Sequence, residues 1–123
     1  MTTNEFIKKK EKEWQGSNTV RTKNISRTYK VLWVREAFTF MVQSNYPEKV
    51  FVIERLRKQS FIEGKPNTND EIGAVEYRIG YYILGKIGRA NGKWVWGQFC
   101  PLIPAGDLTK LFNKAKIDGT IIS

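Results

Sequence analysis

The sequence contains no histidine, and this absence excludes more chemistry than any other feature of the composition. Without imidazole, Ser-His-Asp and Cys-His catalysis and histidine metal sites are all excluded. A single cysteine, Cys100, likewise excludes a thiolate zinc site and an internal disulfide. We expect Cys100 to be a small apolar residue on the packed face of the fold rather than a nucleophile.

Long apolar runs are also missing. No stretch of about 18 apolar residues is present, so no transmembrane helix is predicted. Residues 1–15 carry charges where a signal peptide needs its apolar segment. Together with the lone cysteine, these features predict a protein of the reducing cytoplasm that has no membrane association.

Phosphate-binding loops are excluded by spacing. Three residues separate Gly88 from Gly92, where a P-loop has four, and Trp94 stands where that motif needs serine or threonine. The segment is therefore interpreted as a hairpin turn. These exclusions favour a non-enzymatic protein with no cofactor, no metal and no catalytic residues.

One enzymatic alternative survives, a small metal-dependent nuclease that holds Mg²⁺ between carboxylates on neighbouring strands. Such enzymes have the pattern Asp…Glu-x-Lys, with the lysine near the attacked phosphate. Glu76 and Arg78 follow this pattern only loosely, because arginine replaces the lysine and cannot serve as a base. Salt pairing of Glu76 with Arg78 or Lys86 is the simpler interpretation. The candidate ligands are the acidic residues on or beside predicted strands, Glu54, Asp70, Glu71 and Glu76.

The length of 123 residues and the apolar fraction of 41% are typical of one domain with a sizeable core. We predict a single domain over 1–123, in which residues 1–28 form a helix followed by a mobile basic arm. The helix is expected over 4–14, with Thr3 or Asn4 as its cap, and residues 15–28 are polar and irregular.

Alternating and β-branched patterns predict most of the sheet. Residues 29–42 favour a strand, although a helix would also place several of their apolar side chains on one face. Residues 44–48 predict a turn, residues 50–57 a second strand, and residues 64–70 a polar loop.

The clearest element is a hairpin over 74–103, whose first strand alternates between apolar odd and mostly polar even positions. Asn91 and Gly92 predict a two-residue turn, which pairs Ile87 with Trp96 and places Trp96 on the apolar odd face. Three glycines within the hairpin predict a bulge, a bend or a close approach of another group: Gly80, Gly85 and Gly97.

A second helix is predicted over 108–117, with Asp107 as its N-cap and Gly119 as its left-handed C-terminal residue. The predicted fold is thus α+β, with an antiparallel sheet of about four to five strands, a prominent C-terminal hairpin, an N-terminal helix and a C-terminal helix.

The net charge of +9 is distributed unevenly. Residues 1–30 carry eight basic and three acidic side chains, and residues 49–93 carry nine basic and five acidic ones. Such an excess favours a polyanionic partner, either nucleic acid or an acidic protein, although it also serves simple solubility.

Basic residues interleave with aromatic ones on the even face of the hairpin. Binding of single strands needs cations for the phosphates and flat rings for the bases, and the lysines of 8–12 would track the backbone. If a terminal helix covers Tyr82, however, this face is a second core layer instead. The predicted nucleic-acid-binding residues are Arg78, Tyr82, Lys86, Arg89, Lys93, Arg55, Arg57 and Lys58.

The leading functional hypothesis is therefore a non-enzymatic nucleic-acid-binding or nucleoprotein-associated module that uses this basic and aromatic face. The alternative is a protein-interaction module, a regulator or inhibitor of an acidic partner. The metal-dependent nuclease is the second alternative.

Overall fold

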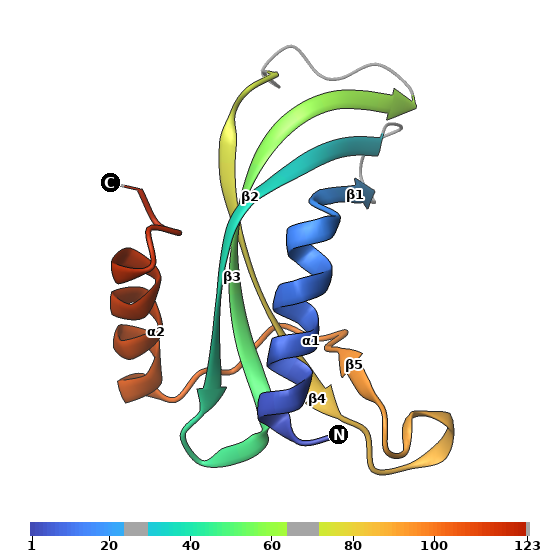
Figure 1. Cartoon of the computed structure of the whole chain (residues 1–123), viewed down its shortest axis with the longest axis vertical. Helices are drawn as coiled ribbons and strands as arrows, with labels where there is room; N and C mark the ends of the chain where they lie inside the picture. The colour runs from blue at the N-terminus through green and yellow to red at the C-terminus, as the bar shows by residue number, and fades with distance from the viewer. Residues whose placement is uncertain (24–29, 64–71, 123) are drawn as a thin grey trace.

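The computed structural model describes residues 1–23, 30–63 and 72–122, and its strands form one antiparallel sheet in sequence order (Figure 1). This confirms the predicted α+β class, with a helix at each end of the chain. The elements are α1 (Thr3–Gly16), β1 (Thr19–Lys23), β2 (Lys30–Gln43), β3 (Tyr46–Glu63), β4 (Val75–Leu84), the 3-10 helix η1 (Gly88–Ala90), β5 (Trp94–Trp96) and α2 (Ala105–Ile117).

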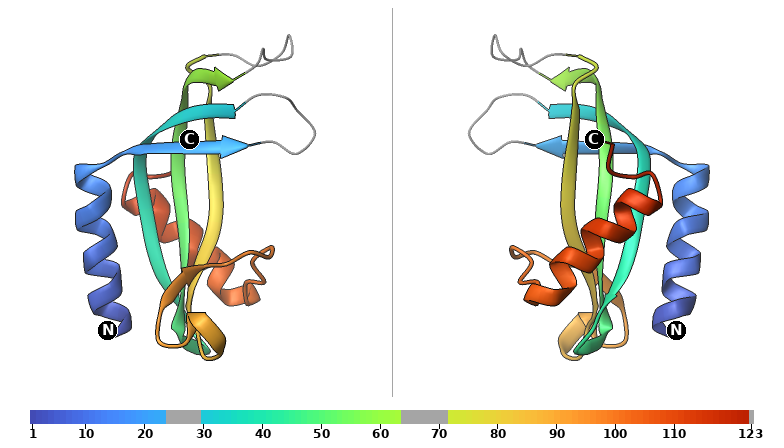
Figure 2. Two further views of the ribbon diagram at one scale, coloured as in Figure 1. Left: turned by 90° about the vertical axis from the view of Figure 1, so that its right-hand side faces the viewer. Right: turned by 90° about the vertical axis from the view of Figure 1, so that its left-hand side faces the viewer.

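The two helices lie on opposite faces of the sheet, which we call the α1 face and the α2 face (Figure 2). β2 and β3 are long and curved, and their register shifts at several points along the ladder. Such bulges bend a strand and increase its twist. Among the described residues, neither helix is long and apolar enough to cross a bilayer.

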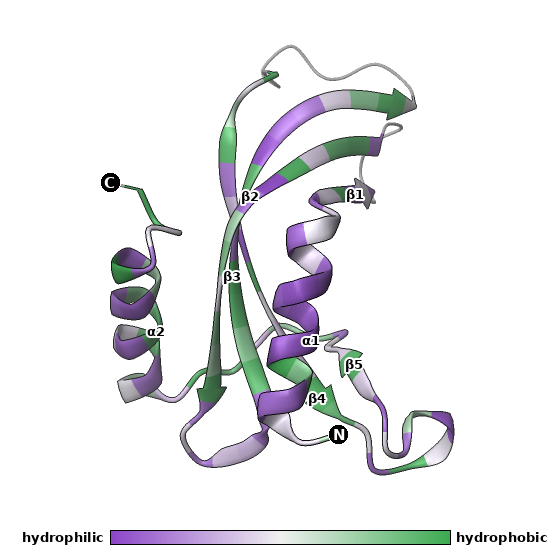
Figure 3. Cartoon of the chain, viewed as in Figure 1, coloured by the Kyte–Doolittle hydropathy of each residue, from purple (hydrophilic) through white to green (hydrophobic). Residues whose placement is uncertain are grey.

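The helix α1 begins within a capping box. The Thr2 hydroxyl accepts a hydrogen bond from the Glu5 backbone N–H at 3.2 Å, and the Glu5 carboxylate accepts one from the Thr2 N–H at 3.1 Å. The cap is thus Thr2 rather than Thr3 or Asn4. Figure 3 shows that α1 is largely hydrophilic, so it is held to the sheet by a few apolar side chains, Phe6 and Trp14 among them.

The helix α2 begins earlier than predicted, with Pro104 at its N-cap, which places Asp107 inside its first turn. The Asp107 carboxylate accepts a hydrogen bond at 2.9 Å from the backbone N–H of Ser44, in the turn between β2 and β3. This bond holds the pKa of Asp107 below its usual value. Gly119 has a φ of 80°, as predicted for the residue that ends this helix.

Residues 29–42 were open to two interpretations, and the strand is the one observed, as β2. β3 extends beyond the predicted 50–57 at both ends. The predicted arm over 15–28 contains β1, whose Val20 is buried. Residues 24–28 of that arm and the predicted loop over 64–70 lie outside the described residues.

The predicted two-residue turn at Asn91 and Gly92 is wrong. Gly92 has a φ of 77°, as expected, but Asn91 has a φ of −56°. The connection instead contains η1, and Gly85 donates its N–H to the Lys93 carbonyl at 2.8 Å. The helical turn adds residues to the connection, so the pairing of β4 with β5 begins farther from the tip of the hairpin.

This longer connection changes the register. Trp96 pairs with Tyr82 instead of Ile87, and Trp94 pairs with Leu84. Because the shift is by an odd number of residues, Trp96 moves from the predicted odd face to the even face, which is the α1 face, and Trp94 lies on the same face. Ile87 is left 83% exposed.

The same shift explains Cys100, which is exposed rather than packed on a core face. β5 ends at Trp96, so the chain leaves the ladder before it reaches the cysteine. The predicted close approaches at strand glycines are confirmed. A Cβ atom at Gly80 would collide with the Trp96 ring, and one at Gly97 with the Tyr81 ring.

Candidate anion-binding groove

The eight residues predicted to form one binding surface lie in three separate regions. Three lie on the α1 face, two on the α2 face, and three at the connection between β4 and β5. The α1 face carries Arg78, Tyr82 and Lys58, the α2 face carries Arg55 and Arg57, and the connection carries Lys86, Arg89 and Lys93.

Tyr82 is half-buried beneath α1. Its ring centroid lies 5.1 Å from that of Phe6, 6.4 Å from that of Trp14 and 5.0 Å from that of Trp96. This burial raises the pKa of the Tyr82 phenol to about 12, and the Glu54 carboxylate adds to the effect. The ring is thus part of a core layer, as the covered alternative had it, and not an open stacking platform.

Arg78 belongs to a buried ion-pair triad. Its Nε donates to Glu54 Oε1 at 2.8 Å, and the Arg35 Nε donates to Glu54 Oε2 at 2.7 Å. Glu54 is fully buried, and the Arg78 guanidinium also lies 5.0 Å from the Trp96 ring centroid. The three charged groups join β2, β3 and β4 through hydrogen bonds, and both Arg78 bonds go to Glu54, while 33% of the Arg78 side chain stays exposed.

Lys58 is also buried on the α1 face, at the upper end of the sheet. Its ammonium lies 5.2 Å from the centroid of the Trp33 ring and 3.5 Å from the Glu76 carboxylate. These contacts give Lys58 a structural role. Glu76 therefore pairs with Lys58 and not with its predicted partners, because Arg78 pairs with Glu54 and Lys86 with Glu48.

Arg55 and Arg57 point to the other side of the sheet. Both bind the Glu36 carboxylate, at 3.2 Å and 2.7 Å from their Nε atoms. Arg55 also donates to the Gly119 carbonyl at 2.8 Å, and Arg57 to the Gly73 carbonyl at 2.8 Å. The two arginines fasten the chain that follows α2 and the start of β4 to the sheet, and their hydrogen bonds hold the pKa of Glu36 below its usual value.

The connection between β4 and β5 carries the remaining cations. Lys86 pairs with Glu48 at 2.6 Å, whereas Arg89 and Lys93 are exposed. No acidic side chain of the described residues lies within ion-pair distance of Arg89 or Lys93. These two side chains are therefore available to an external anion.

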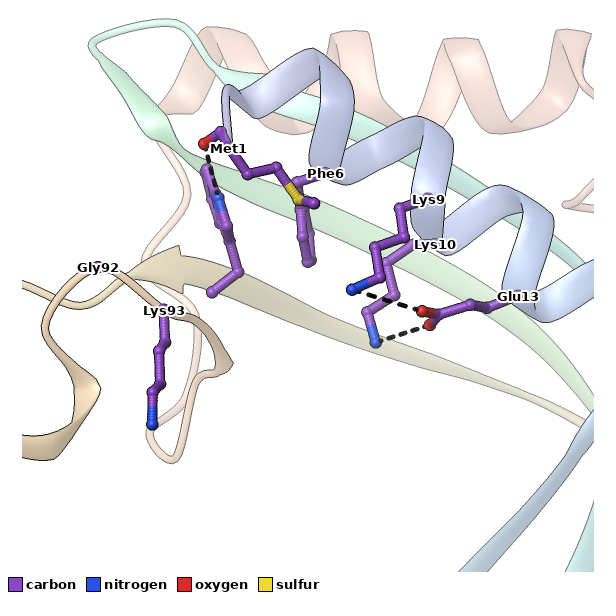
Figure 4. A pocket seen from close by; sticks show the side chains of 8 residues that line it. Met1, Phe6, Lys9, Lys10, Glu13, Gly92 and Lys93 are labelled. Atoms are coloured by element: carbon purple, nitrogen blue, oxygen red, sulfur yellow. Dashed lines mark hydrogen bonds and ion pairs between the residues drawn. The ribbon is translucent and has the colours of Figure 1, made fainter.

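Lys93 lies across from α1 at a groove of about 310 Å³ (Figure 4). We call this site the lysine groove. Two lysines of α1 and one lysine of the hairpin connection line it, and the Lys93 side chain points away from α1 in Figure 4. Two aromatic rings of the lining, Phe6 and Trp94, stack with 4.6 Å between their centroids and 13° between their planes. The residues that define the groove are Phe6, Lys9, Lys10, Glu13, Lys93 and Trp94.

Glu13 orders the lysines of α1. Its carboxylate lies 3.3 Å from the Lys10 ammonium and 4.0 Å from that of Lys9. The Lys10 ammonium also lies 5.1 Å from the Tyr82 ring centroid. With Lys93, the groove holds three cations and one carboxylate, so it favours an anion.

Sequence reasoning found Lys93 through the hairpin and found Lys9 and Lys10 only as part of a basic arm. The signal for the groove was present in the helix itself. Lys9 and Lys10 follow Phe6 by three and four residues, the spacing that places side chains on one side of a helix. Because Phe6 docks on the sheet, the neighbouring lysines are directed toward the edge of the contact.

The acidic residues of the nuclease alternative do not come together within the described part of the chain. Glu54 is enclosed by two arginines, and the Glu76 side chain is 60% exposed beside Lys58. Asp70 and Glu71 lie outside the described residues. Within those limits, no group of three potential metal-ligating side chains is present.

Comparison of the chain with protein-family models, with curated protein sequences and with solved structures returns no significant match.

Proposed function

We propose that this protein is a non-enzymatic nucleic-acid-binding or nucleoprotein-associated module that uses the lysine groove to hold part of a single strand. The observation that carries the proposal is the placement of Lys9, Lys10 and Lys93 around one cavity beside the half-buried Trp94 indole. Ammonium groups bind phosphates, and an indole edge gives a base or sugar an apolar contact.

The size of the groove supports a small segment of a strand rather than a duplex. Its volume of about 310 Å³ is at the lower end of the range for small-molecule sites, roughly 300–1,000 Å³. A nucleotide or two fits this scale better than the side of a double helix. The groove therefore favours single-stranded ligands, whose phosphates and bases are both accessible.

Further exposed cations lie on the two elements that carry the groove lysines, α1 and the connection between β4 and β5. Lys8 and Lys12 lie on exposed positions of α1, and Arg89 lies in η1, four residues before Lys93. In the part of the chain that the structure describes, none of these three has an acidic partner. They provide a path for the phosphates that continue beyond the groove.

The direct test is fluorescence anisotropy with a short labelled oligouridylate at low salt, comparing the wild type with Lys9→Glu and Lys93→Glu. We expect each substitution to weaken binding by about tenfold, because it replaces an attraction with a repulsion. The matched control is Lys116→Glu, which makes the same charge change in the last turn of α2, on the other face.

The control should stay within about twofold of the wild type. Undetectable binding by the wild-type protein at low salt would refute the proposal. Equal losses in Lys93→Glu and Lys116→Glu would also refute it, since binding would then depend on net charge alone.

A further inference from the structure

A second cavity lies on the α2 side of the hairpin, apart from the lysine groove. It has a volume of about 280 Å³, and we call it the hairpin pocket. None of its lining residues is charged. Those used in the argument are Tyr81, Ile83, Ala90, Val95, Gly97 and Phe99.

Backbone contacts fix the shape of the hairpin pocket. The Gly97 N–H donates to the Tyr81 carbonyl at 2.8 Å. The Tyr81 ring lies so close to Gly97 that a Cβ atom there would collide with it. The ring that forms one wall is therefore held in place before any ligand binds, which lowers the entropic cost of binding.

Large apolar side chains are exposed at and beyond the rim. Phe99 lines the hairpin pocket and is 79% exposed, and Leu102, three residues later, is 81% exposed. Exposed apolar residues gathered beside a preformed cavity mark an interaction site more often than isolated ones do. An aromatic side chain at such a site is also a typical anchor for a protein partner.

The charges around the hairpin pocket are positive. Lys49 pairs with Ile83 across the β3–β4 ladder, and its ammonium lies 4.8 Å from the Tyr81 ring centroid. Arg89 immediately precedes Ala90. Among the residues that the structure places, no carboxylate forms an ion pair with either cation.

From this arrangement we propose that the hairpin pocket binds an acidic segment of a partner protein, which inserts one apolar side chain between Tyr81 and Phe99. Lys49 and Arg89 attract the carboxylates on either side of the inserted residue. The volume of about 280 Å³ lies below the range typical of small-molecule sites and suits a single side chain. This inference does not rest on the proposed function, because it uses a different cavity and a different ligand.

The test uses three labelled decapeptides and fluorescence anisotropy. The first alternates aspartate and glutamate around one central phenylalanine, the second has serine at the centre, and the third keeps the phenylalanine but replaces the acids with lysine. We expect binding of the first peptide only, with losses of at least about tenfold for the other two.

Variants of the protein test whether the acidic phenylalanine peptide binds at the hairpin pocket. Phe99→Ser should weaken binding of the acidic phenylalanine peptide by about tenfold, and Lys49→Met by about threefold. Lys49→Met keeps the apolar stem on the Tyr81 ring, and Lys116→Met is its matched control for the loss of one charge. Circular dichroism confirms that each variant is folded, which we expect because Phe99 is mostly exposed.

The outcomes are distinct. Loss of peptide binding in Phe99→Ser and Lys49→Met, with Lys116→Met and Lys93→Glu unchanged, supports the hairpin pocket. Equal binding of the serine peptide, equal losses in Lys49→Met and Lys116→Met, or no binding at millimolar peptide would overturn it. Loss of peptide binding in Lys93→Glu alone would assign the peptide to the lysine groove and also overturn the inference.

Discussion

The guanidinium of Arg35 lies 3.7 Å from the centroid of the Trp14 ring, while its Nε binds the buried carboxylate of Glu54. One side chain of β2 therefore connects α1 to the ion-pair triad in the sheet. The Trp14 ring also contacts Phe38 and Phe40, with centroids 5.2 Å and 5.1 Å away. These contacts position α1, and α1 in turn places Lys9 and Lys10 opposite Lys93.

The triad makes Glu54 a strong determinant of stability. We expect Glu54→Gln to lower the free energy of unfolding by about 3–5 kcal/mol, because it leaves two arginines without a counter-charge in a buried site. The matched control is Glu76→Gln, whose side chain is 60% exposed beside Lys58 and which should cost about 1 kcal/mol or less. Urea unfolding followed by tryptophan fluorescence measures both, and similar values would contradict the triad's role.

Trp14 should hold the second half of α1 on the sheet. Trp14→Ala removes contacts to Phe38, Phe40 and Arg35, and we expect a loss of about 3 kcal/mol in the free energy of unfolding. The exposed neighbour Gln15 provides the control, since Gln15→Ala should change stability by less than about 0.5 kcal/mol. Hydrogen exchange should increase across α1 in Trp14→Ala; unchanged protection would show that α1 does not need this anchor.

Because the Tyr82 phenol is half-buried, we expect the protein to lose stability in alkali. Burial raises the pKa of its phenol to about 12, whereas an unfolded chain ionises its tyrosines near pH 10. Between these values the unfolded state binds fewer protons than the folded state, so the free energy of unfolding falls as the pH rises. Absorbance titration should show one phenol ionising last, near pH 12, and Tyr82→Phe should remove that phase. A last phase that persists in Tyr82→Phe would assign it to another tyrosine.

Glu36 predicts a loss of stability in acid. Hydrogen bonds from Arg57, with further attraction from Arg55, hold the pKa of its carboxyl below the usual value. Its stabilising contribution is therefore complete above about pH 4.5 and is lost as the pH falls through the folded pKa. Denaturant unfolding at a series of pH values should show a shallower acid loss for Glu36→Gln than for the wild type, with Glu11→Gln as the control. Identical slopes for the wild type and Glu36→Gln would refute the assignment.

The salt dependence of the binding affinity measures how many phosphates the lysine groove neutralises. Each phosphate of a single strand contributes a slope of about −0.7 to the plot of log affinity against log salt. If Lys9, Lys10 and Lys93 each contact one phosphate, the slope should be about −2, and Lys93→Gln should reduce its magnitude by about 0.7. Anisotropy titrations at several salt concentrations give these slopes, and an unchanged slope in Lys93→Gln would exclude a phosphate contact there.

Much of the secondary structure could be predicted because its causes are local. The β-branched residues of β2 and the positive φ of Gly119 each depend on a few neighbouring residues. Helix starts were missed by one to three residues. Thr2 competes with residues of similar capping ability at the start of α1, whereas α2 begins at Pro104 without a side-chain cap and Asp107 binds the Ser44 N–H instead.

The binding surface could not be predicted in the same way. Alternation along β4 separated its two faces correctly but did not indicate that a helix packs on each of them. The register of β5 depended on η1 and on the contacts of Gly85 with Lys93, so a turn signal at Asn91 gave the wrong pairing. The first error concerns contacts between segments that are distant in the chain, whereas the second arises within the connection between Gly85 and Lys93.

By itself, the sequence determined the α+β class, the two helices, the excess of positive charge and the exclusion of histidine chemistry. Tertiary structure alone decided which cations share a surface. Burial of Phe6 and Trp14 against the sheet places α1 over Tyr82, and the same docking brings Lys9 and Lys10 to the cavity that Lys93 also lines. The physical reason is that burial of apolar surface is non-directional, so local pattern shows which side chains must be buried but not which partners bury them.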